Sequence, residues 1–171
     1  MSLFSRMFGR RSDDRAELRP LWHRIVALSR DPAWYAECRV ADTVPGRFDA
    51  ITLVLVAVLL RMEREPELIP ASVRLTELFV DDMDGQLRQS GVGDLVVGKH
   101  IGRLMGVLGG WLGAYRDALA AGDDVALGEA IDRNVSLDEG GEPAVVAVRF
   151  KALASRIDAL PADRLLAGEI A

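Results

Sequence analysis

The stretch from Ala50 to Leu60 is apolar at every position except Thr52, and it constrains the fold more than any other part of the sequence. It falls well short of the roughly 20 apolar residues that a helix needs to span a bilayer. A helix that is hydrophobic on all sides is instead buried in a protein core. We therefore predict a buried core helix that Asp49 can cap and that runs to about Arg64.

Elsewhere, apolar side chains recur at intervals of three and four residues, the period of an α-helix. Proline and glycine separate these segments, and none shows the period-two alternation of half-buried β-strands. We predict an all-α protein that forms a single compact bundle of about six to seven helices. The stripes expected to face the core are Val73, Thr76, Val80, Met83 and Leu87 within 71–90, and Val97, Ile101, Leu104, Leu108, Leu112, Tyr115 and Leu119 within about 94–121; other helices are expected over about 15–30, 124–135 and 143–160.

The composition suits one globular domain, because 50% of the 171 residues are hydrophobic and 27% are charged. The formal net charge of −5 is uneven: residues 1–30 carry +4 and the rest of the chain carries −9. Nucleic-acid binding depends on cationic side chains, so the acidic body is not expected to bind nucleic acid. Cys38 is the single cysteine and cannot form an internal disulfide, which favours a cytoplasmic location.

The first 14 residues differ from the rest and are predicted to be a basic, flexible segment preceding a helical domain over 15–171. They lack the apolar core of a secretory signal, so export is not expected. Their apolar side chains recur at helical spacing among arginines, as in helices that touch anionic lipid. A solvated terminus is the alternative, and the sequence leaves both open. The apolar residues are Leu3, Phe4, Met7 and Phe8, and the arginines are Arg6, Arg10 and Arg11.

Three neighbouring carboxylates, Asp81, Asp82 and Asp84, raise the alternative of a magnesium-dependent enzyme on a helical bundle. Such an enzyme would need a second acidic motif on a facing helix, and the pair at 123–124 is a weak substitute. The simpler interpretation is that these carboxylates are solvated and that Asp84 pairs with Arg88 one helical turn later. We therefore predict no metal site.

Other catalytic patterns are weak. The segment 93–100 approaches a phosphate-binding loop, but His100 stands where that loop needs a hydroxyl. Neither His23 nor His100 has a carboxylate or cysteine at helical spacing that would activate it, and Cys38 has no evident base. We therefore predict that the protein has no catalytic residues and no cofactor.

Glycines fall at every fourth position of the longest predicted helix, at Gly98, Gly102, Gly106 and Gly110. Each costs up to about 1 kcal/mol of helix stability relative to alanine, so some interaction should offset that cost. Small residues at this spacing let another backbone approach closely. We expect tight packing against another helix of this chain, and the alternative is an open groove that receives a helix of a partner.

Three separated motifs resemble the ubiquinol-cytochrome c chaperone family. They are the loop Asp-Thr-Val-Pro-Gly-Arg-Phe-Asp at 42–49, the segment 82–99 with Asp-Met-Asp, Leu-Arg, Gly-Val-Gly-Asp-Leu and Val-Gly-Lys, and the tail Leu-Leu-Ala-Gly-Glu-Ile at 165–170. The resemblance covers most of the chain from about Leu18 and suggests a bacterial member.

This resemblance implies a helical, non-catalytic assembly factor that binds newly made cytochrome b while the cytochrome bc complex, respiratory complex III, is assembled. Mitochondrial relatives work with a second assembly factor and at the ribosome. For this chain, we expect a cytoplasmic location, with peripheral contact to the inner membrane through Leu3, Phe4, Met7 and Phe8. A generic helical protein-binding adaptor remains an alternative. The residues expected to bind the partner are Gly46, Arg47, Asp84, Arg88, Gly91, Gly93, Asp94 and Lys99, and the helix-docking groove would contain Gly98, Gly102, Gly106 and Gly110.

Overall fold

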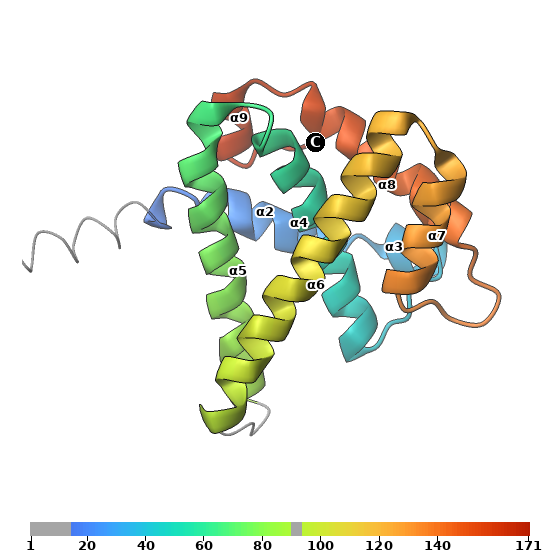
Figure 1. The fold of residues 1–171 in the computed structure, drawn as a ribbon, viewed down its shortest axis with the longest axis horizontal. Helices are drawn as coiled ribbons and strands as arrows, with labels where there is room; N and C mark the ends of the chain where they lie inside the picture. The colour runs from blue at the N-terminus through green and yellow to red at the C-terminus, as the bar shows by residue number, and fades with distance from the viewer. Residues whose placement is uncertain (1–14, 90–93) are drawn as a thin grey trace, which may run out of the picture.

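The computed structural model describes residues 15–89 and 94–171, with the backbone alone described at 86–89 and 94–101 (Figure 1). Its regular elements are all helices, and the described residues contain no strand beyond an isolated bridge between Val40 and Leu137. The expected all-α bundle is confirmed. The elements are α2 (Arg19–Ser29), α3 (Pro32–Ala36), α4 (Val44–Met62), the 3-10 helix η1 (Pro66–Leu68), α5 (Ile69–Gln89), α6 (Asp94–Ala121), α7 (Asp124–Asn134), α8 (Pro143–Asp158) and α9 (Ala162–Leu166).

Helix α4 is the centre of the bundle and confirms the predicted core helix. It contacts α2, α5, α6 and α8, which surround it in Figure 1. The consecutive side chains of Leu53 through Val58 are all buried, so every face of the helix is covered. The described residues include no helix that is long and apolar enough to cross a membrane. The apolar run therefore serves the core.

The start of α4 corrects one detail of the prediction. The helix begins at Val44, and Thr43 caps it by accepting a hydrogen bond from the N–H of Gly46 at 3.2 Å. Pro45 falls in the first turn, where no helical hydrogen bond is lost. Asp49 was predicted to cap the helix but lies inside it, with its side chain buried. The helix therefore begins upstream of the predicted cap, and Pro45 lies inside its first turn.

Helices α5 and α6 form the longest antiparallel pair, and their joined ends extend beyond the other helices in Figure 1. Both follow the predicted ranges closely, with α5 starting at Ile69 because Pro70 fits its first turn. The core-facing stripe of α5 was predicted incorrectly in part. Its most buried side chains are Ala71, Leu75, Phe79 and Met83, whereas Val73 is 55% exposed.

The C-terminal segment of the chain packs against α2. Leu165 and Ile170 are buried, and Arg24 donates a hydrogen bond from Nε to the Ile170 carbonyl at 2.7 Å. Gly168 has a φ of +75°, and a Cβ at this position would lie 2.8 Å from the Pro20 carbonyl oxygen. Glycine is thus required both by the backbone conformation and by the close approach of α2.

We predict that Gly46→Ala destabilises the protein. The Cβ of alanine would lie 2.0 Å from the Ala41 carbonyl oxygen, so the start of α4 must shift away from the preceding loop. We expect a loss of about 1–3 kcal/mol in the free energy of unfolding, measured by urea denaturation.

Gly85→Ala in α5 is the matched control, because no neighbouring atom outside its own helix lies within 4 Å of its added Cβ. There alanine should leave stability unchanged or raise it by up to about 1 kcal/mol. Equal unfolding free energies for Gly46→Ala and the unmodified chain would contradict the steric argument.

Candidate functional site

The residues of the 42–49 motif have clear structural roles. Arg47 is exposed and forms an ion pair with Asp42 at 2.6 Å. Phe48 packs on Phe79 of α5, with ring centroids 6.0 Å apart. Asp49 accepts a hydrogen bond from the backbone N–H of Ser136 at 2.9 Å, which ties α4 to the segment after α7. Together with the close approach at Gly46, these contacts show that the motif fixes the position of the N-terminal end of α4.

Four of the remaining residues predicted to bind a partner, Asp84, Arg88, Asp94 and Lys99, belong to helices α5 and α6. Asp84 is in α5 and partly buried, and Arg88 follows it in the same helix. Asp94 and Lys99 belong to the first turns of α6, but the side chains of Arg88, Asp94 and Lys99 lie outside the described part of the structure. Gly91 and Gly93 also lie outside the described residues. The structure therefore leaves the direct involvement of these positions as a prediction.

The glycines of α6 face open space, contrary to our expectation of tight internal packing. At Gly102, Gly106 and Gly110, no neighbouring atom outside their own helix lies within 4 Å of an added Cβ. The same holds for Gly109 and Gly113. The core contacts of α6 come instead from its large buried side chains: Leu108, Trp111, Tyr115 and Ala118. Gly98 belongs to the part of α6 of which only the backbone is described.

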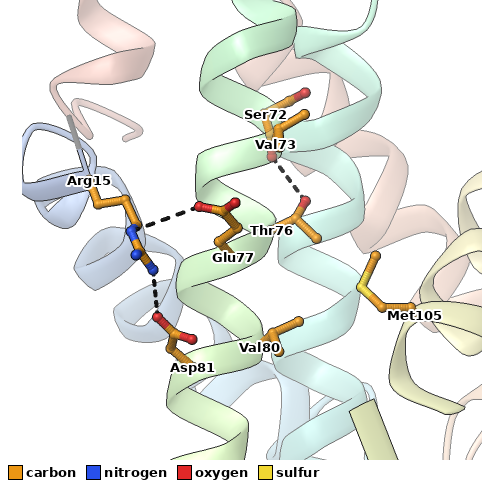
Figure 2. Close-up of a pocket in the computed structure, with 8 residues that line it drawn as sticks. All are labelled: Arg15, Ser72, Val73, Thr76, Glu77, Val80, Asp81 and Met105. Atoms are coloured by element: carbon orange, nitrogen blue, oxygen red, sulfur yellow. Dashed lines mark hydrogen bonds and ion pairs between the residues drawn. The ribbon is translucent and has the colours of Figure 1, made fainter. Parts of the chain in front are cut away.

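A groove of about 540 Å³ lies along α5 and reaches α6 (Figure 2). Its apolar lining includes Val73 and Val80 of α5 and Met105 of α6, and the Met105 side chain lies across from α5 in the close-up. Val73 is 55% exposed and Met105 is 43% exposed, so the groove presents large apolar groups to solvent. Such exposed apolar surface often marks a binding site for another molecule.

One rim of this groove is charged. Arg15 pairs with Asp81 at 2.8 Å and with Glu77 at 3.8 Å, as the dashed lines in Figure 2 show. Thr76 and Ser72 complete the polar part of the lining. The groove therefore combines an apolar floor with an acidic edge that a cationic side chain already contacts.

The groove is not evident from the sequence, because the helical spacing of Val73 and Val80 predicts that both face the core. Helix α5 carries a second apolar stripe, Ala71, Leu75, Phe79 and Met83, and this second stripe packs in the core. A helix that buries one face needs only one apolar stripe. The other stripe of α5, with Val73 and Val80, therefore indicated that another face of this helix is apolar and exposed.

The groups considered for catalysis are dispersed. Within 15–89 and 94–171, no group of three or more His, Cys, Asp or Glu side chains is placed to hold a metal ion. Asp81 is engaged by Arg15, and His23 is exposed on α2. Burial raises the pKa of the Cys38 thiol, which disfavours the reactive thiolate. No arrangement of described residues specifically favours the magnesium-enzyme alternative.

The fold is thus an all-helical bundle with an exposed apolar groove along α5. Residues 36–171 match the family model described as ubiquinol-cytochrome C chaperone. The match covers most of the chain, and the protein therefore belongs to the ubiquinol-cytochrome c chaperone family. The expected family is confirmed.

The solved structures include a close counterpart, described as the crystal structure of the Cbp3 homolog from Brucella abortus. The two chains are 29% identical, with a TM-score of 0.81 over 99% of this chain and 96% of the other. None of the curated proteins compared with this chain matches it. The similarity in structure thus extends beyond the part that matches the family model.

We predict that Asp49 makes stability depend on pH. Burial raises the pKa of this carboxyl, and its hydrogen bond from Ser136 only partly opposes that effect. In the unfolded chain the carboxyl ionises near its ordinary value of 3.8. The folded state therefore retains the proton to higher pH, and Asp49 lowers stability as pH rises from that value through its raised pKa.

Asp49→Asn keeps an acceptor oxygen for Ser136 and removes the titration. We expect the unfolding free energy of Asp49→Asn, relative to the unmodified chain, to increase over this pH range in urea titrations. Asp132→Asn, on the exposed surface of α7, controls for the loss of one negative charge. A difference between Asp49→Asn and the unmodified chain that stays constant with pH would contradict this prediction.

Proposed function

We propose that this protein is a non-catalytic assembly factor that binds newly made cytochrome b during assembly of the cytochrome bc complex. Membership of the ubiquinol-cytochrome c chaperone family supports a role in the assembly of respiratory complex III. The open apolar groove between α5 and α6 is the observation that supports client binding by this chain.

The chemistry of the groove suits a segment of a membrane protein. Val73, Val80 and Met105 offer apolar contacts to a hydrophobic helix before that helix is packed with its partners. Gly102 and Gly106, on the exposed surface of α6, add no side chains that would hold a client helix away. We therefore propose that the client also contacts Gly102 and Gly106, which are close to Met105 in the sequence of α6 but do not line the groove itself.

Charge supports the same proposal. The chain after residue 30 carries a net charge of −9, and Glu77 and Asp81 lie at the groove edge. Cytoplasmic loops of membrane proteins are enriched in lysine and arginine. We therefore propose that the protein acts at the cytoplasmic face of the inner membrane, where an apolar segment and its basic flank could be bound together.

We predict that Val73→Asp weakens capture of cytochrome b. A charge at this exposed groove position opposes burial of an apolar client, and losing one apolar anchor worth about 1.4 kcal/mol lowers affinity about tenfold. The measurement is recovery of cytochrome b from solubilised membranes of the native host with the tagged, full-length chain.

Val148→Asp on α8 is the matched control, since Val148 is 70% exposed but belongs to a different helix from those that line the groove. It should capture cytochrome b as well as the unmodified chain, and both variants should unfold at the same urea concentration. Failure of the unmodified chain to capture cytochrome b, together with normal complex III after gene deletion, would reject the proposed function.

A further inference from the structure

The outer face of α8 is apolar between residues 143 and 152. The exposed side chains in this range are Ala144, Val145, Val148 and Ala152. Val145 is 40% exposed and Val148 is 70% exposed. A helix on the surface of a bundle normally presents charged or polar side chains to water. The outer face of α8 is therefore an exposed apolar surface, and it belongs to a different helix from those that line the groove.

The charged residues of this part of α8 lie at its flanks. Arg149 forms an ion pair with Asp31 at 2.7 Å, and its guanidinium lies over the Trp34 ring at 4.9 Å from the ring centroid. Lys151 forms an ion pair with Asp124 of α7, which packs beside α8 (Figure 1). Because both cations are bound to neighbouring elements, neither interrupts the apolar face.

Three exposed acidic residues, Asp138, Glu139 and Glu142, precede this face and are called the acidic cluster below. Glu142 comes immediately before α8, and its carbonyl accepts a hydrogen bond from the N–H of Val145 at 3.0 Å. The Asp138 carbonyl accepts a hydrogen bond from the N–H of Gly141 at 2.9 Å, so the cluster lies in one turn at the start of α8. In the part of the chain that the structure describes, no ion pair involves the side chains of this cluster.

One cation lies close to the acidic cluster. Arg39 donates a hydrogen bond from Nε to the Glu139 carbonyl at 3.1 Å. With Arg39 counted, the three carboxylates still leave a formal charge of −2. This charge opposes contact with anionic lipid or nucleic acid. A second copy of this chain is also a poor match, because its residues after 30 carry a net charge of −9. Charge therefore favours a cationic protein segment.

We propose that the outer face of α8 binds a basic amphipathic helix of another protein. Apolar side chains of that helix cover Val145 and Val148, and its lysine or arginine side chains contact the acidic cluster. Val148 lies about 9 Å from Glu142 along the helix axis, at a rise of about 1.5 Å per residue. A partner helix aligned with α8 therefore carries its cations between one and two turns from the residue that contacts Val148. This inference does not rest on the proposed function, because α5 and α6 line the client groove.

The test measures binding of a fluorescein-labelled synthetic peptide to the purified full-length chain by fluorescence anisotropy. The peptide carries leucines on one side of a helix and lysines on the other. We expect binding that weakens as salt is added, because exposed charges are screened. Val145→Ser/Val148→Ser should lower the affinity about tenfold by removing the apolar contacts. Glu139→Gln/Glu142→Gln should lower the affinity and reduce its dependence on salt.

Val73→Ser is the matched control, because Val73 is 55% exposed but lines the client groove. It should bind the peptide as tightly as the unmodified chain, and all variants should unfold at the same urea concentration. A loss of affinity in Val73→Ser alone would show that the peptide binds the groove, and it would overturn the inference. Equal affinity of the unmodified chain and Val145→Ser/Val148→Ser would overturn it as well.

Two further measurements address the charge of the partner and its identity. A peptide with glutamate in place of lysine should bind much more weakly, and equal binding of the two peptides would contradict a cationic partner. Sedimentation should show no dimer that Val145→Ser/Val148→Ser abolishes, since such a dimer would mean that a second copy covers the face. No cytochrome b is present, so these experiments and the client-capture experiment can fail independently.

Discussion

The complete burial of α4 is the constraint on which the rest of the structure depends. A helix that is apolar on every side needs neighbours on every side, and α2, α5, α6 and α8 supply them. Leu21, Leu75 and Phe150 are among the side chains of these helices that are fully buried in the core. What remains exposed on them, including Val73 and Met105, is therefore left over after the core is complete.

The motifs that carry the family resemblance have mainly structural roles where the structure describes them. Gly46 allows the loop before α4 to approach the helix, and Asp49 holds Ser136 through a partly buried hydrogen bond. Gly168 performs a similar role where the tail meets α2. A distinctive motif in this chain thus indicates how the fold is held together, and the exposed groove must be found from side-chain burial instead.

The sequence was sufficient to predict the helical class, the core helix and most helix boundaries, because these depend on local periodicity and on proline and glycine. It was insufficient where tertiary contacts decide between equivalent local patterns. Val73 and Leu75 both belong to plausible apolar stripes of α5, and only packing against α2 and α4 selects the stripe of Leu75 for the core. Likewise, the spacing of Gly102 and Gly106 predicts a close contact but cannot tell whether this chain supplies the second surface.

The open glycines of α6 also affect how selective a contact on this helix would be. Without Cβ atoms, Gly102, Gly106 and Gly110 expose the peptide groups of the helix, which are the same whatever the surrounding sequence. A helix resting on them would be held by close backbone approach and weak Cα–H···O contacts more than by matching of particular side chains. Such a surface selects a bound helix by its shape and thickness, and it tolerates variation in the sequence of that helix.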